Sequence, residues 1–154
     1  MKIIKSLELT VKHIGVLCIA LLFFLMIVQV VLRYGFGYTH FLTEELGRYL
    51  LVWATLAGMA IETKRAGHIR VSFLVEQLPS GVVRIWQVLI DVVVLLLFLM
   101  LIYTGIDSTI FNHGQESAGL QIPLSIPFLC VPIFFLVSAI FLSEKIRQQI
   151  RGKL

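Results

Sequence analysis

Three ionisable side chains lie close together where an apolar segment begins, and their spacing suits specific polar contacts. Glu44 and Arg48 are four residues apart and Glu45 and Arg48 three apart, so on a helix the arginine lies one turn from both carboxylates. A charge near hydrocarbon costs about 2.5–3.5 kcal/mol on insertion scales, so it is expected to be paired. The spacing predicts a paired network that forms a contact site, with Arg33 as a candidate further partner.

The two acids also have a simpler interpretation. If Thr43 caps a helix, Glu44 and Glu45 lie in its first turn, where the positive end of the helix dipole stabilises carboxylates. This interpretation leaves Arg48 unexplained, because a cation is unfavourable near that same end. The sequence leaves both interpretations open.

Other groups suited to chemistry are scarce. Asp91 lies within an apolar segment, and Arg84, seven residues earlier on the same helical face, is expected to neutralise it; a proton relay is the less favoured alternative. Cys18 and Cys130 are isolated in apolar segments and are predicted to be buried thiols. The histidines flank the apolar segments instead of pairing within them to ligate haem: His13, His40, His68 and His113. We therefore expect no enzyme, no metal site and no cofactor.

The elements that position these residues are long apolar segments. Of 154 residues, 58% are hydrophobic and 14% charged, and the mean hydropathy is +0.95; a soluble domain has about 25% charged residues. Four segments approach or exceed the roughly 20 residues that cross a bilayer as a helix. The predicted fold is an all-α integral membrane protein, with one membrane domain over 1–154 and transmembrane helices at about 14–33, 42–62, 85–107 and 121–143.

A fifth, shorter element is predicted between the second and third spans. In the segment 69–79, Val71, Leu74, Val75 and Leu78 follow helical spacing, which indicates an amphipathic helix lying in the membrane interface. Residues 69, 71 and 73 also alternate as in a strand. The helix is preferred because an unpaired strand at a membrane surface leaves its backbone polar groups unsatisfied.

Two further patterns concern packing within the spans. The second segment carries small residues that allow close helix approach, namely Gly47, Ala54, Ala57, Gly58 and Ala60. It is therefore expected to be central to the packing. In the fourth segment, Pro127 and Pro132 are expected to kink or locally unwind the helix.

The basic residues predict the orientation. Eleven of the thirteen Lys and Arg residues lie before the first span, between the second and third, or after the fourth. The positive-inside rule places these segments, and hence both termini, in the cytoplasm. The net charge of +4 follows from this asymmetry and does not indicate nucleic acid. Membrane lipids are expected partners of the chain. The first segment is too long for a signal peptide and is expected to be retained.

The order and spacing of several motifs resemble the small membrane (Q) subunit of tripartite ATP-independent periplasmic (TRAP) transporters. The resemblance covers nearly the whole chain, including the four-span topology and a proline-marked fourth helix. Its residues are Arg33, Tyr34, Glu44, Glu45, Arg48, Tyr49, Trp53, Gly58, His68 and Pro79.

The resemblance implies a bacterial inner-membrane protein that acts as a small accessory or scaffold subunit. Its implied partners are a large multi-span permease subunit and a periplasmic substrate-binding protein, in a system that uses a sodium gradient to import an organic acid such as a C4-dicarboxylate, sialic acid or sugar acid. In that family the large subunit holds the substrate and sodium sites. The alternative is a structural membrane-anchor subunit of another inner-membrane complex.

Overall fold

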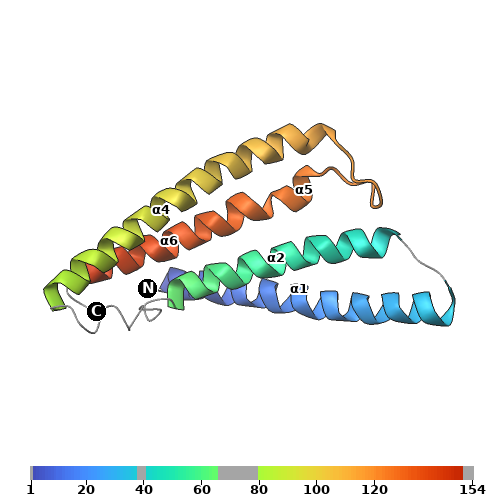
Figure 1. The fold of residues 1–154 in the computed structure, drawn as a ribbon, viewed down its shortest axis with the longest axis horizontal. Helices are drawn as coiled ribbons and strands as arrows, with labels where there is room; N and C mark the ends of the chain where they lie inside the picture. Colours follow the sequence, from blue (N-terminus) through green and yellow to red (C-terminus); the bar gives the residue numbers. More distant parts are fainter. Residues whose placement is uncertain (1, 38–40, 66–79, 151–154) are drawn as a thin grey trace.

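The structure, a computed structural model, describes residues 2–37, 41–65 and 80–150. Four long helices account for most of them: α1 (Lys2–Gly35), α2 (Phe41–Arg65), α4 (Ser80–Phe111) and α6 (Cys130–Ile150). A short 3-10 helix, η2 (Asn112–Gly114), follows α4, and one helical turn, α5 (Ser125–Phe128), precedes α6. The described part of the chain is therefore all-helical apart from its turns (Figure 1).

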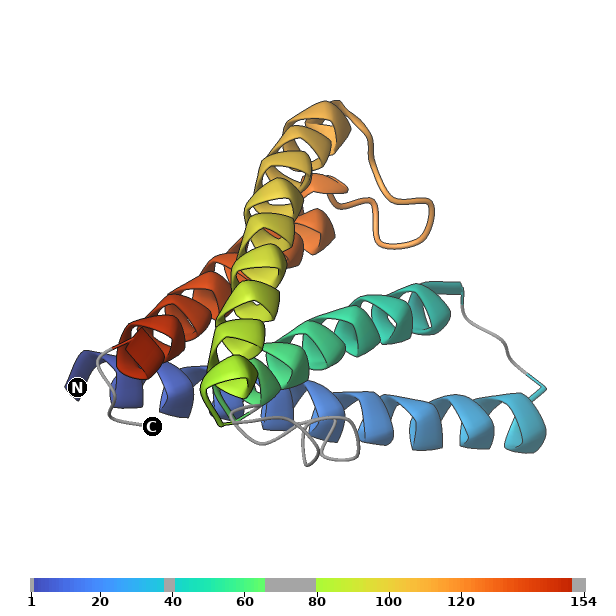
Figure 2. The same ribbon diagram turned by 60° about the vertical axis from the view of Figure 1, so that its left-hand side comes forward.

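The helices form a row in the order α1, α2, α6, α4. Helix α2 packs against both α1 and α6, and α6 packs in turn against α4. The α1–α2 hairpin and the α4–α6 hairpin converge at one end and separate at the other, as both views show (Figures 1 and 2). We call the end with Lys2, Arg65 and Ser80 the closed end, and the end with Gly35, Phe41 and Phe111 the open end.

The main apolar core joins α1, α2 and α6. Ala57 and Ala60 are fully buried, and they pack with Phe134 and Cys130 of α6, which are each 1% exposed. The Trp53 ring meets Phe134 edge to face at 5.8 Å. The central position expected for α2 is thus confirmed by its buried alanines, although Gly58 is exposed and has open space beside it.

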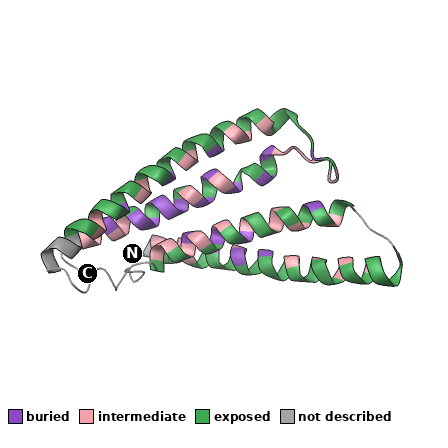
Figure 3. Cartoon of the chain, in the orientation of Figure 1, coloured by how far each residue is buried: buried purple, intermediate pink, exposed green. Residues whose placement is uncertain are grey.

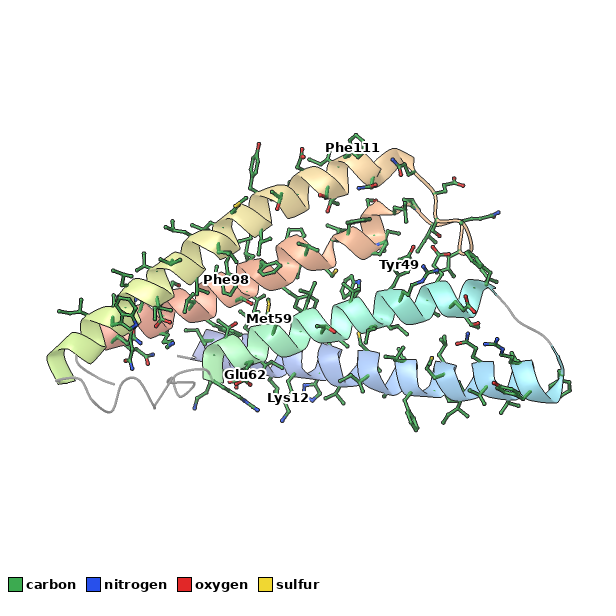
Figure 4. All side chains as sticks on the ribbon, viewed as in Figure 1. Lys12, Tyr49, Met59, Glu62, Phe98 and Phe111 are labelled. Carbon is green, nitrogen blue, oxygen red and sulfur yellow. The ribbon has the colours of Figure 1, made fainter. Side chains whose placement is uncertain are left out.

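A second core joins α4 to α6 through Phe98, Ala139, Leu142 and Ile146. Figure 4 shows Phe98 on the side of α4 that faces α6. Gly105 permits this close approach, because a Cβ there would meet Val131 Cγ1 at 2.9 Å and the Pro132 ring at 3.0 Å.

The prolines interrupt the last helical segment as the sequence predicts. Helix α5 ends at Phe128 and α6 starts at Cys130, with Leu129 between them. Pro132 has no N–H to bond the carbonyl four residues earlier, so the helix loses a bond at this point. The Cys130 thiol donates to the carbonyl of Pro127 at 3.0 Å, and the predicted burial of Cys18 and Cys130 is confirmed.

Three helices in the described residues are long and apolar enough to cross a membrane: Ile4–Gly35, Ile85–Gly114 and Ser125–Gln149. Helix α2 is not among them, because its charged residues lower its hydropathy. Of the four predicted spans, the one at 42–62 therefore has no counterpart among these three helices. The large apolar side chains of α1 and α4 are mostly exposed, whereas buried residues gather on α6 and on one side of α2 (Figure 3). The amphipathic segment at 69–79 lies outside the described residues.

Candidate functional site

Glu45 is the most highly connected side chain at the open end. It is 6% exposed although it is a carboxylate. Its Oε1 accepts the Tyr49 hydroxyl at 2.5 Å, and its Oε2 accepts the backbone N–H groups of Gly119 at 2.8 Å and Leu120 at 3.1 Å. Both oxygens are therefore occupied, and the carboxylate joins α2 to the loop between η2 and α5. Figure 4 shows Tyr49 on the side of α2 that faces this loop.

The loop has a defined shape that presents those two N–H groups. The N–H of Ser117 donates to the carbonyl of Ile122 at 2.9 Å, and the N–H of Leu124 donates to the carbonyl of Gln115 at 2.9 Å. Between these bonds Gln121 has a positive φ of 51°, a left-handed conformation that is costly for a residue with a Cβ. The result is a tight turn whose tip points at α2.

The close contact between the loop and α2 favours glycine at position 119. A Cβ on Gly119 would lie 2.5 Å from Oε2 of Glu45 and 3.0 Å from Cδ1 of Phe41. No real side chain tolerates such distances, so any larger residue would push the carboxylate away from the loop. Glu45, Tyr49, Gly119 and Leu120 therefore form one unit, which we call the latch.

The ionic network expected from the sequence is wrong in its pairing. Glu44 and Arg48 are both exposed, and within the described residues neither forms an ion pair with the other or with Glu45. The side of α2 that carries Glu45 and Tyr49 faces the loop, while Glu44 and Arg48 lie on another side. Arg33 is exposed and makes no ion pair in the described part of the chain.

The helix start also differs from the expected one. Helix α2 begins at Phe41, so Thr43 lies within its first turn and is not the residue that precedes the helix. Glu44 remains in the first turn, where a carboxylate is favourable. Its exposed position therefore agrees with the simpler interpretation of this acid, whereas Glu45 has specific partners.

Glu44 and Arg48 line a groove between α1 and α2. The groove has a volume of about 510 Å³. Apolar side chains form most of its walls, and the two charged groups lie on its α2 side. The lining residues are Leu22, Met26, Gln29, Thr43, Glu44, Gly47, Arg48 and Leu51.

The remaining sequence-predicted residues are dispersed. Tyr34 is 81% exposed at the end of α1. Trp53 packs in the apolar core and Gly58 is exposed on α2. His68 lies outside the described residues. Of the predicted set, the structure brings together Glu45 with Tyr49, and Glu44 with Arg48 as neighbours on one groove.

The closed end contains polar contacts that the sequence did not reveal. Asp91 of α4 is 9% exposed; its Oδ1 pairs with Nζ of Lys145 at 3.0 Å and its Oδ2 accepts the Gln149 amide at 3.0 Å. This charge is balanced from α6, because Lys145 and Gln149 lie one turn apart on the face toward α4. That spacing was the available signal. The side chain of Arg84, which was expected to neutralise Asp91, lies outside the described part of the structure.

A second ion pair joins α1 to α2 at the same end. Lys64 pairs with Glu8, and its Nζ also lies 5.6 Å from the ring centre of Phe141 in α6. Both side chains of this pair are about one-third exposed, so it contributes less than a buried pair. The two contacts of Lys64 nevertheless link α2 to both α1 and α6.

Sequence similarity to known proteins extends over most of the chain. A family model described as "Tripartite ATP-independent periplasmic transporters, DctQ component" matches residues 14–152. A putative TRAP transporter small permease protein of Haemophilus influenzae is 34% identical over 140 residues, which are 88% of this chain and 86% of the relative. The ectoine TRAP transporter small permease protein TeaB of Halomonas elongata is 28% identical over 140 residues, 90% of this chain and 71% of the relative.

One relative is much longer. The isethionate TRAP transporter permease protein DctMQ of Oleidesulfovibrio alaskensis is 28% identical over 111 residues. These are 71% of this chain but only 18% of the relative, so the matching region is a small part of that permease.

Proposed function

Because this chain belongs to the DctQ component family of the TRAP transporters, we propose that it is the small subunit of a sodium-coupled importer of an organic acid. It works with a large permease subunit and a periplasmic substrate-binding protein in the bacterial inner membrane. The much longer isethionate relative supports such a partner, because the region that matches this chain is there part of a larger permease. Isethionate is itself an organic acid, the substrate class proposed here.

A bracing role is supported most directly by the way the buried carboxylates are used. Glu45 is bound by Tyr49 and two backbone N–H groups, and Asp91 by Lys145 and Gln149. Carboxylates held by the chain's own groups stabilise its fold and are not free to bind sodium or substrate. Binding and coupling are therefore assigned to the large subunit.

The groove between α1 and α2 is the proposed contact face for that subunit. Arg48 and Glu44 lie beside apolar walls with no ion pair in the described residues, and a charge at membrane depth is expected to find one. A helix of the large subunit with an apolar face and a carboxylate near Arg48 would complement the groove. The proposal keeps Glu44 and Arg48 as interface residues, while Glu45 is assigned to the fold.

We propose that α2 also crosses the membrane, in addition to the three apolar helices, which gives four spans. Its 25 residues rise about 37 Å, enough to cross the roughly 30 Å hydrocarbon layer. Helices α1 and α6 both pack against α2 and cover part of its surface, and a protein partner on the groove would shield its charges. The segment 69–79 is proposed to lie along the cytoplasmic interface at the closed end.

The proposed orientation places both termini and the closed end in the cytoplasm. Phosphatase fusions test it: a fusion after Leu154 should be inactive, whereas one within the loop at Glu116 should be active. High activity after Leu154 would overturn the orientation.

The function is tested by co-expressing the chain with the products of its neighbouring genes. A tagged version should purify with a large membrane protein, and proteoliposomes containing both should take up an organic acid only with a sodium gradient and the binding protein. Purification with a redox protein instead would support the alternative anchor role. Equal uptake in proteoliposomes lacking this chain would remove the accessory role.

A further inference from the structure

The two helical hairpins are joined differently at their two ends. Towards the closed end, α2 and α6 share an apolar core that includes Ala60 and Val137. At the open end the ribbons separate, and the loop between η2 and α5 reaches across to the start of α2 (Figures 1 and 2). In the described residues, the hydrogen bonds that cross there are those of Glu45 with Gly119 and Leu120.

We propose that Glu45 is a positioning residue that latches the open end: its carboxylate holds the α1–α2 hairpin to the loop of the α4–α6 hairpin. When the latch is released, the hairpins move apart at the open end while the closed end stays packed. The proposal concerns the chain itself and does not depend on which transporter it serves.

The shape of the loop and the latch support one another. Two N–H groups converge on Oε2 only because the turn at 117–122 holds them side by side, and that turn includes the left-handed Gln121. A strained conformation persists only where surrounding contacts hold it. The two bonds from Glu45 act on the residues immediately before Gln121, so losing the carboxylate should also loosen the turn.

The latch is suited to opening because it is polar and lies next to water-accessible groups. Gln115, Glu116, Ala118 and Gln121 are exposed around it. Regions with few buried apolar contacts open at lower free energy than the core. One carboxylate with three donors can be replaced by water, whereas separating the Ala57–Phe134 core would expose apolar surface on both helices.

Opening would also move the groove that carries Arg48. Glu44 and Arg48 flank Glu45 in sequence but line the α1 side of α2, so the latch fixes where the groove lies relative to α4. The affinity of any partner that contacts both hairpins would therefore depend on whether the latch is closed.

Distances between spin labels test the latch in the full chain in lipid nanodiscs. One label pair spans the open end at Tyr34 and Phe111, which are 81% and 76% exposed; a second spans the closed end at Leu9 and Ile85, which are 56% and 71% exposed. Both are made with Cys18 and Cys130 replaced by Ala. Hydrogen exchange over residues 115–124 is measured in parallel.

Glu45→Ala should broaden the open-end distribution toward longer distances, leave the closed-end distribution unchanged, and accelerate exchange of the loop amides about 10- to 100-fold. Glu45→Gln should have a smaller effect, because an amide can accept from the loop and donate to Tyr49. The matched control is Glu44→Ala, an exposed carboxylate one residue earlier, which should match wild type in every readout.

An open-end distribution and loop exchange for Glu45→Ala equal to those of Glu44→Ala would overturn the proposal. If Glu45→Ala also disturbs the closed end, the fold itself has failed and Gly119→Ala decides. That variant keeps the carboxylate, but its Cβ would lie 2.5 Å from Oε2 of Glu45 and so displaces the carboxylate from the loop N–H groups. It should broaden the open end alone, and an open end unchanged from that of Gly114→Ala would again overturn the latch.

Discussion

The closed and open ends of this molecule use charged side chains in different ways. At the closed end, ion pairs add to an apolar core: Asp91 with Lys145 between α4 and α6, and Glu8 with Lys64 between α1 and α2. At the open end, Glu45 alone supplies the described hydrogen bonds between the hairpins, and Arg48 faces a groove. The closed end is held by an apolar core and ion pairs, whereas the hydrogen bonds of the open end can be replaced by bonds to water.

The difference shows that similar residues in an apolar sequence need not share a role. Glu44 and Glu45 are adjacent, yet one is exposed on a groove and the other is 6% exposed and bound at both oxygens. Their positions on the helix decide this, because successive residues point about 100° apart. Changes at the two ends should therefore have separable effects on stability and on partner binding.

The largest loss of stability is expected at the closed end. Lys145→Ala leaves Asp91 buried without its cation, which costs about 3–5 kcal/mol for a buried pair. The apparent midpoint of thermal unfolding in micelles should fall strongly, while Arg147→Ala, which removes an exposed cation two residues later, should leave it unchanged. The double variant Asp91→Leu with Lys145→Leu should recover much of the loss. Equal midpoints for Lys145→Ala and Arg147→Ala would contradict the role given to this pair.

A smaller loss is expected from Gly119→Ala at the open end. The new Cβ would lie 2.5 Å from Oε2 of Glu45, and overpacking of this kind costs about 1–3 kcal/mol. The same unfolding measurement checks it against Gly114→Ala, where a Cβ meets nothing within 4 Å. If both variants unfold at the same temperature as wild type, the contact between Gly119 and the carboxylate is not as close as described.

The smallest expected effect is a gain in the stability of the loop. Gln121 has φ 51°, so Gln121→Gly should relieve a left-handed conformation and stabilise the loop by about 1 kcal/mol. Slower hydrogen exchange over residues 115–124 would report it. Gln115→Gly is the matched control, because Gln115 has an ordinary φ of −104° and gains nothing from glycine. Faster exchange in Gln121→Gly would show that the side chain, and not the strain, matters there.

The sequence predicted what depends on composition and local spacing. It indicated a helical membrane protein, the packing role of Ala57 and Ala60, the break at the prolines of the fourth segment, and the family. It could not indicate the loop partner of Glu45, Gly119, which lies 74 residues away in the chain. Two backbone N–H groups carry no sequence signal, and the Arg48 spacing therefore suggested a nearer but incorrect partner. The partner of Asp91, Lys145, lies 54 residues away, and the spacing of Lys145 and Gln149 was the one signal for it.

The division between the two ends is tested most directly by Arg48→Ala, measured at once for co-purification with the large subunit and for thermal unfolding of the isolated chain. We predict that co-purification falls several-fold while the unfolding midpoint stays at the wild-type value, because Arg48 is exposed on the groove and forms no ion pair in the described residues. Arg147→Ala, at the closed end, should change neither. Wild-type co-purification of Arg48→Ala, or a fall in its unfolding midpoint comparable to that of Lys145→Ala, would contradict the assignment of the open-end groove to partner binding.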